Sequence, residues 1–262
     1  MGAHSVPAAG GGLRSADSVS VDPPTRWVGG HTRRRARTVW RVSKEPATVT
    51  LDREAHTDRV DLGDGAWVDL TRGWLTGGAE VYRTLVDNVS WTQGSVFRYE
   101  RYVDDPRLGA YWRAGTPPPH PIFLDAHRAL QDRYGVRFDG CAIAWYRDGN
   151  DSVAFHRDRD LKWLDDTLIL LLTLGQQRPF HLRPLANKYA HHLDHNGATH
   201  DLSPASGDLI VMGGSTQTAW QHSVPKVRRP IGGRISLQWR WTSKLGRQEV
   251  GGSYRKPRLY SR

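Results

Sequence analysis

The second half of the chain is a series of short apolar segments separated by turn-forming residues, and this pattern constrains the fold most. Glycine, proline, asparagine or aspartate interrupts the chain repeatedly after residue 139, which favours short strands over helices. Seven or eight strands of this kind are typical of a double-sheet jelly roll, the cupin-like architecture. Residues 168–174 are continuously apolar and could instead form a buried helix, but seven residues bounded by turns favour a strand. The predicted strands are 141–146, 152–156, 167–174, 179–183, 208–212, 218–222 and 234–241.

The first half of the chain carries two helical patterns and at least two strands. Apolar residues recur at helical spacing within 77–89, where Thr76 is a possible N-terminal cap, and within 121–134. Strands are predicted over 66–70 and 96–103, the second followed by a polar, aromatic loop that runs through residue 119. The fold class is therefore mainly β with flanking helices (α+β).

Length and composition indicate one folded domain without a membrane segment. The chain has 262 residues, of which 38% are hydrophobic, enough for one sizeable core. No apolar run approaches the roughly 20 residues that span a bilayer, and the N-terminus lacks the apolar core of a secretory signal. The single cysteine, Cys141, excludes an internal disulfide and is predicted to be a small buried side chain. We therefore expect a monomer in the reducing cytoplasm, with no membrane partner.

The net charge is unevenly distributed along the chain. Residues 1–47 hold eight Lys/Arg against three Asp/Glu, residues 226–262 hold eleven against one, and residues 48–225 hold 18 against 23. We expect 1–47 to be a disordered basic arm and 244–262 a basic tail. Basic ends on a mildly acidic body favour a polyanion such as nucleic acid, although such ends can also serve only solubility.

A candidate metal site follows from His156-Arg157-Asp158 and the later His222. Alternate residues of an extended strand point to the same side, so His156 and Asp158 can reach one ion while His222 comes from another strand. Two histidines and one carboxylate form the facial triad of non-haem Fe(II) oxygenases. Among 12 histidines and 27 acidic residues a chance His-x-Asp is expected, so the pattern depends on its surroundings.

Those surroundings include two arginines that suit a carboxylate cosubstrate. Many enzymes with this triad use 2-oxoglutarate as the electron source for dioxygen activation, and its far carboxylate then needs a buried cation. Arginine fits, because its planar fork binds a carboxylate through two hydrogen bonds. Arg234 and Arg240 are six residues apart and therefore share one face of a strand. A zinc hydrolase could also use two histidines and an aspartate, but it would not need the arginine pair.

Four segments together resemble the AlkB family of Fe(II)/2-oxoglutarate-dependent nucleic-acid dealkylases, particularly its bacterial members. The segments are 146–158, 207–214, 220–226 and 234–240, and their order and spacing match across most of the chain. The resemblance implies a double-stranded β-helix core over 139–241. It also implies a substrate lid mainly over 91–120, within a domain spanning 48–243.

The resemblance also implies a role for individual residues. It assigns three iron ligands: His156, Asp158 and His222. It assigns three residues to 2-oxoglutarate: Tyr146, Arg234 and Arg240, with Arg234 on the far carboxylate and Arg240 near the iron-bound end. One position departs from the family, because Ala144 stands where many members have an asparagine that binds the cosubstrate. We therefore expect one cosubstrate hydrogen bond to be absent.

The implied reaction oxidises an N-alkyl carbon of a base in DNA or RNA, using Fe(II), 2-oxoglutarate and dioxygen, and releases aldehyde, succinate and CO2. A base within a duplex must be flipped out, or the substrate must be single-stranded. Three residues are candidate substrate contacts: Asp160, Tyr111 and Trp112. Asp160 could instead be a turn residue, and either aromatic could pack in the core. Two other functions stay open: a same-fold oxygenase acting on a small molecule or protein, and a catalytically impaired nucleic-acid-binding relative.

Overall fold

The computed structural model describes residues 48–98, 100–187 and 199–243. The predicted basic arm, 1–47, and basic tail, 244–262, lie outside the described residues.

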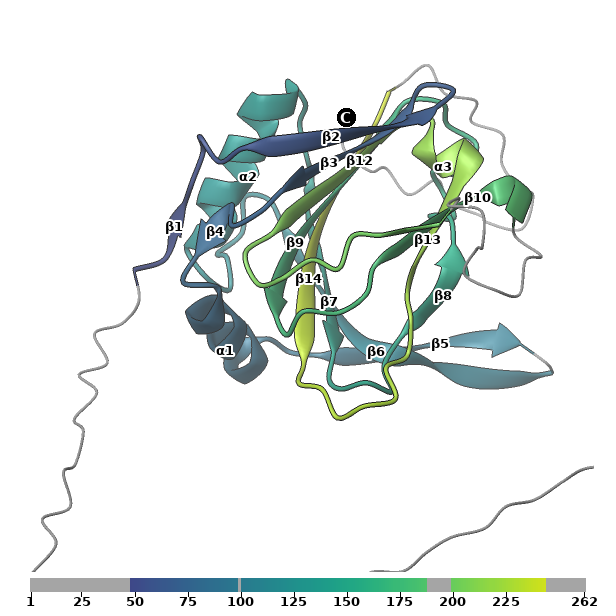
Figure 1. Ribbon diagram of the computed structural model, residues 1–262. Helices are drawn as coiled ribbons and strands as arrows, with labels where there is room; N and C mark the ends of the chain where they lie inside the picture. The colour runs from purple at the N-terminus through teal and green to yellow at the C-terminus, as the bar shows by residue number, and fades with distance from the viewer. Residues whose placement is uncertain (1–47, 99, 188–198, 244–262) are drawn as a thin grey trace, which may run out of the picture. The chain divides into compact units, whose positions relative to one another are not determined.

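Two antiparallel sheets form the body of the described domain (Figure 1). The larger sheet has the order β2 (Thr57–Gly63), β3 (Ala66–Thr71), β12 (Leu209–Gly214), β9 (Thr167–Gly175), β14 (Arg234–Thr242), β7 (Gly140–Tyr146), β6 (Arg101–Arg113) and β5 (Thr92–Arg98). The smaller sheet has the order β11 (His200–Asp201), β10 (His181–Pro184), β13 (Trp220–Val224) and β8 (Val153–His156). A third, minor sheet pairs β1 (Thr50–Leu51) with β4 (Leu75–Thr76). The predicted mainly-β, jelly-roll fold class is confirmed.

The continuous apolar run 168–174, which could have formed a helix, is strand β9. It lies in the middle of the larger sheet, between β12 and β14, and both of its faces are covered. Leu170 and Leu172 pack on one face, while Ile169 and Leu171 pack on the other, toward the smaller sheet. A strand buried on both faces has no polar face, so its sequence does not alternate.

Two helices cover the face of the larger sheet that points away from the smaller sheet (Figure 1). They are α1 (Gly78–Asn88) and α2 (Ile122–Tyr134), and both agree with the predicted ranges. Gly135 ends α2 in the left-handed conformation at φ 64°, which glycine adopts without strain. The predicted capping role of Thr76 is wrong, because Thr76 belongs to β4 and its hydroxyl lies 2.7 Å from that of Thr50.

The segment predicted as one strand, 96–103, instead contains a hairpin turn: residues 96–98 end β5 and residues 101–103 begin β6. The chain reverses after Arg98, pairing Arg98 with Arg101, and Glu100 in the turn has φ 62°. The reversal contains no glycine, proline or asparagine, so the aromatic and β-branched residues on both sides looked continuous. Strand β6 then continues to Arg113, which shortens the loop predicted through residue 119.

Smaller differences concern segments with weak patterns. Residues 216–219 form a short helix, α3 (Thr216–Ala219), directly before β13, where a strand had been predicted to begin. Strand β2 was not predicted, because it pairs only with β3 at the edge of the sheet and exposes several of its side chains. A 3-10 turn, η1 (Leu185–Asn187), follows β10. None of the helices in the described ranges is long and apolar enough to cross a membrane.

Candidate metal centre

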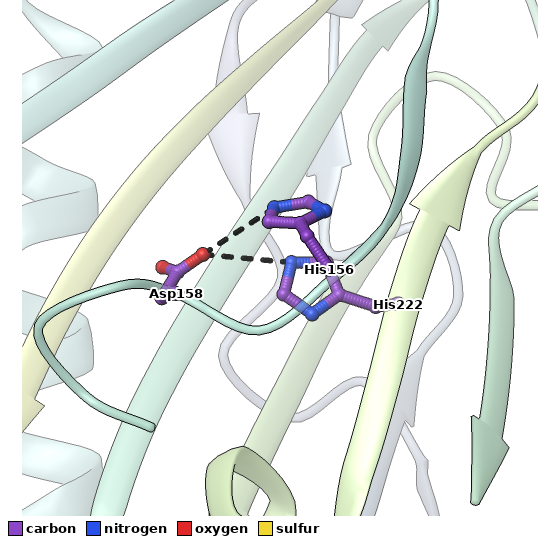
Figure 2. A group of neighbouring side chains, drawn as sticks. All are labelled: His156, Asp158 and His222. Carbon is purple, nitrogen blue, oxygen red and sulfur yellow. Dashed lines mark ion pairs between the residues drawn. The ribbon is translucent and has the colours of Figure 1, made fainter. Parts of the chain in front are cut away.

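The three residues predicted to bind iron come together between the two sheets (Figure 2). His156 is the last residue of β8, Asp158 follows it by two residues, and His222 lies in β13 directly opposite His156 in the strand register. One candidate ligand atom from each residue lies within 4.8 Å of those of the other two. The spacing of the motif therefore produces the expected cluster.

The distances within the cluster suit a shared cation better than direct hydrogen bonds. Asp158 Oδ1 lies 3.5 Å from His156 Nε2 and 3.7 Å from His222 Nε2. Both exceed the usual hydrogen-bond length. Atoms that each lie about 2 Å from one ion are roughly 3 Å apart, which these distances approach.

Neighbouring groups hold each ligand in its orientation. The Nδ1 of His156 lies 2.9 Å from the carbonyl oxygen of Ala154, which favours a proton on Nδ1 and leaves Nε2 free for a metal. The backbone N–H of Asp158 donates to Oε1 of Gln217 at 2.8 Å. Arg240 donates from Nε to the second carboxylate oxygen of Asp158 at 2.5 Å. The ligands are therefore supported by a second set of polar contacts.

The protonation states favour metal binding at neutral pH. Burial alone would raise the pKa of Asp158, but the charge of Arg240 and contacts with the two histidines hold it well below its usual value. Burial, with the neighbouring His156 acting in the same direction, lowers the pKa of His222 to about 3. A charged carboxylate and a neutral imidazole are the forms that bind a cation.

The cavity beside the triad ends at a buried arginine. Arg234 is fully buried and lines the same cavity as the three candidate ligands. Burial lowers its pKa to about 10, so the guanidinium remains charged at neutral pH. Its Nε and Nη1 find no hydrogen-bond partner among the described residues, and its Nη2 contacts Thr173 Oγ1 only at 3.4 Å. A buried cation with two unused donors fits an anionic guest such as a carboxylate.

Tyr146 lies close to Arg234 and to two further arginines, Arg107 and Arg178. Its ring is buried, and its hydroxyl accepts a hydrogen bond of 3.0 Å from Nη1 of Arg107. The guanidinium carbons of Arg178 and Arg234 lie 5.5 and 6.0 Å from the centre of its ring. The cavity is therefore strongly electropositive around Tyr146, as a dicarboxylate would require.

The two predicted arginines share one face of β14, as their spacing indicated. Both line the cavity, and Arg240 lies beside Asp158, so it is at the metal end. Ala144 lies on the same face of β7 as Tyr146, and its methyl group offers no hydrogen bond. The roles of Tyr146, Arg234 and Arg240 toward a cosubstrate stay predictions.

The predicted substrate contacts have different outcomes. The prediction that Trp112 contacts the substrate is wrong, because this side chain is only 4% exposed. It packs edge-on against Phe123 of α2 and donates to the carbonyl of Thr116, on the helix-covered face away from the metal ligands. Adjacent strand residues point to opposite faces, so Tyr111 lies on the same face as the cavity-lining Arg107 and is 61% exposed. Asp160 lies in the turn after Asp158 and is partly buried.

Sequence reasoning missed three side chains that contact the site. Arg107 lay in a segment predicted as a loop, so its orientation toward the cavity could not be anticipated. Gln217 and Arg178 form hydrogen bonds with backbone atoms that are distant in sequence, and no spacing motif predicts such contacts.

Known proteins resemble this chain over most of the described domain. The 2OG-Fe(II) oxygenase superfamily matches residues 78–240. The "Alpha-ketoglutarate-dependent dioxygenase alkB homolog 3" of Bos taurus is 27% identical over 175 residues, covering 61% of this chain and 60% of that protein. The human "DNA oxidative demethylase ALKBH2" is 29% identical over 183 residues, covering 62% of this chain and 67% of that protein. The chain thus spans only about three fifths of the first of these relatives.

Solved structures give a weaker likeness. "The structure of OsALKBH1" aligns at 15% identity with a TM-score of 0.43, covering 69% of this chain and 98% of that one. A Trichoplax adhaerens prolyl hydroxylase aligns at 11% identity with a TM-score of 0.48, covering 67% and 82%. These scores are low, so the assignment rests on the match that covers residues 78–240 and includes all three candidate ligands and both arginines. The chain belongs to the 2OG-Fe(II) oxygenase superfamily.

Proposed function

We propose that the protein removes alkyl groups from nitrogen atoms of nucleobases by Fe(II)- and 2-oxoglutarate-dependent oxidation. One observation carries the proposal: a two-histidine, one-aspartate cluster and a fully buried, incompletely bonded arginine line the same cavity. The names of the AlkB-type relatives support the substrate class, since one is a DNA oxidative demethylase.

Each residue of the site would have a separate role. His156, Asp158 and His222 would hold Fe(II), and Arg234 would bind the far carboxylate of 2-oxoglutarate. Bound iron, with 2-oxoglutarate and dioxygen, would supply the oxidation: one oxygen atom would be added to the N-alkyl carbon, and the other would enter succinate with loss of CO2. The hydroxylated alkyl group would then leave the base nitrogen as an aldehyde. Arg240 would keep the Asp158 carboxylate oriented and ionised throughout.

The β5–β6 hairpin is the proposed substrate lid, within the predicted range 91–120. It extends from the edge of the larger sheet (Figure 1), and its strand β6 sends Arg107 into the cavity. Phe97 and Tyr102 are paired across the hairpin, 64% and 75% exposed, with ring centres 5.3 Å apart. Exposed aromatic rings of this kind suit stacking on the bases of a single strand. Tyr111 and Asp160 remain the proposed contacts nearer the metal.

The remaining features of the proposal come from the sequence. We propose a monomeric, cytoplasmic protein whose basic ends add affinity for phosphate. The single cysteine, which is buried, supports a reducing compartment.

Mass spectrometry of a methylated oligonucleotide tests the proposed substrate. With Fe(II), 2-oxoglutarate and air, the protein should convert N-methylated bases in a single strand to unmethylated bases, and omission of 2-oxoglutarate should prevent the conversion. An unchanged oligonucleotide in a reaction that still forms succinate would overturn the nucleic-acid assignment and favour an oxygenase of small molecules or proteins.

Arg107 provides a prediction about the cosubstrate end of the cavity. Arg107→Ala removes the donor to the Tyr146 hydroxyl and one cavity charge. A hydrogen bond contributes about 1 kcal/mol, so the 2-oxoglutarate concentration for half-maximal succinate formation should rise about five- to tenfold. Arg113→Ala, an exposed arginine on the same strand, is the matched control and should leave it unchanged. An unaltered requirement in Arg107→Ala would mean that Arg107 has no part in cosubstrate binding.

A further inference from the structure

Arg178 is a buried cation beside Tyr146, and its hydrogen bonds go to backbone carbonyls rather than to the candidate metal ligands. Its side chain is 1% exposed. The guanidinium donates to the backbone carbonyls of Asp148 at 2.6 Å, Asp151 at 2.7 Å and Pro225 at 3.1 Å. All three acceptors are main-chain oxygens, so these contacts fix the course of the backbone.

The three carbonyls belong to the two segments that carry the metal ligands. Asp148 and Asp151 lie in the connection that leads from β7 into β8, and β8 ends at His156. Pro225 directly follows β13, which contains His222. Arg178 therefore joins the beginning of one ligand-bearing strand to the end of the other.

The pairing between these strands is short and irregular, and Arg178 reinforces it together with a backbone hydrogen bond of 2.8 Å from Val227 N–H to the Gly149 carbonyl. Strand β8 has four residues and lies at the edge of the smaller sheet. It pairs with β13 at His156–His222 and Val153–Val224, and the register shifts between these two positions. A short edge strand with an irregular register does not by itself fix the relative position of its side chains. Arg178 ties the two strands at the end where Val153 meets Val224.

An ion pair between Arg147 and Asp151 stiffens the same connection. The backbone N–H, Nε and Nη2 of Arg147 donate to the carboxylate of Asp151 at 2.8, 2.7 and 2.9 Å. Asp151 is itself buried, with its carbonyl held by Arg178. The connection is thus bonded through both the side chain and the carbonyl of one residue.

We propose that Arg178 is a positioning residue that sets the distance between His156 and His222 by clamping the connection before β8 to the segment after β13. The inference rests on the proposed metal centre, but it does not depend on the substrate. Residues that orient metal ligands from outside typically change metal affinity by about 10- to 100-fold when removed. Removing the hydrogen bonds of Arg178 should therefore weaken metal binding by about 10- to 100-fold.

Metal affinity of purified, metal-free full-length protein tests the proposal. We expect Arg178→Met, which keeps the volume but removes the donors, to weaken binding of Fe(II) under anaerobic conditions by about 10- to 100-fold. Arg178→Lys, which keeps the charge and some donors, should recover part of the loss. Thermal unfolding of the same samples reports whether each variant is folded.

The matched control is Arg72, which joins two other segments through backbone carbonyls. Arg72 donates to the carbonyls of Leu202 and Ser203 and pairs with Asp208, and none of these residues belongs to the metal cluster. Arg72→Met should lower the unfolding temperature while leaving Fe(II) affinity unchanged. If Arg178→Met does not fold, Asp151→Asn, which loosens the same connection from its other side, should weaken Fe(II) binding by a smaller factor.

Two results would contradict the proposed positioning role of Arg178. The first is a folded Arg178→Met that binds Fe(II) as tightly as the unsubstituted protein. The second, if that variant does not fold, is an Asp151→Asn variant with unchanged affinity. A protein without any Fe(II) affinity before substitution would instead remove the proposed metal centre, so the two failures are distinguishable.

Discussion

Replacing Asp158 with alanine is expected to abolish turnover and to weaken Fe(II) binding by more than about 100-fold, beyond the range for residues outside the coordination sphere. The variant loses a ligand oxygen and also removes the carboxylate to which Arg240 donates. A cation would then approach the Arg240 guanidinium without the negative charge of Asp158 beside it. Metal content after anaerobic gel filtration and succinate formation are the measurements.

Asp165→Ala is the control for this substitution. Asp165 is an exposed carboxylate seven residues further along, outside the cluster of candidate ligands. It should retain both Fe(II) and activity. Full activity in Asp158→Ala would show that the triad is not the metal site.

Replacing Arg234 with alanine is expected to raise the 2-oxoglutarate requirement by more than about 100-fold. A buried carboxylate that loses its arginine partner is destabilised by about 3–5 kcal/mol. Arg234 is fully buried, and its Nε and Nη1 have no partner in the described part of the chain, so both nitrogens are available to the cosubstrate. The 2-oxoglutarate concentration for half-maximal succinate formation is the measurement.

Arg234→Lys separates charge from geometry at the same position. Lysine keeps the positive charge but loses the planar fork, so it should recover only part of the affinity. Arg59→Ala, which removes an arginine at the far edge of the larger sheet, should leave the requirement unchanged. An unaltered requirement in Arg234→Ala would mean that the far carboxylate is bound elsewhere.

The two histidines of the metal cluster were predictable because their placement depends on strand geometry, whereas Asp158 lies two residues beyond the end of β8. Each strand is short, and alternation fixes the face of every side chain once one is known. His156 and His222 are direct partners in the register, so two correctly placed strands suffice to bring them together. The shared face of Arg234 and Arg240 follows from the same rule.

The predictions that were wrong or missing depend on information that local sequence patterns do not contain. Tyr111 and Trp112 are neighbours on one strand, so one had to face the cavity side and the other the helices, but their sequence does not say which. The hairpin turn at Glu100 has no glycine or asparagine to mark it. The contacts of Arg178 and Gln217 join segments that are distant along the chain, and only the assembled sheets bring them together.

Anaerobic titration of the Fe(II)-loaded protein with 2-oxoglutarate tests the assignment of the cavity most directly. We expect a single equivalent to bind per chain, with much higher affinity in the presence of Fe(II) than in its absence. Asp158→Ala should lose this dependence on iron, and Arg234→Ala should lose most of the affinity even with iron bound. Binding that is equally tight with and without Fe(II), or that survives both substitutions, would contradict an Fe(II)/2-oxoglutarate centre at this position.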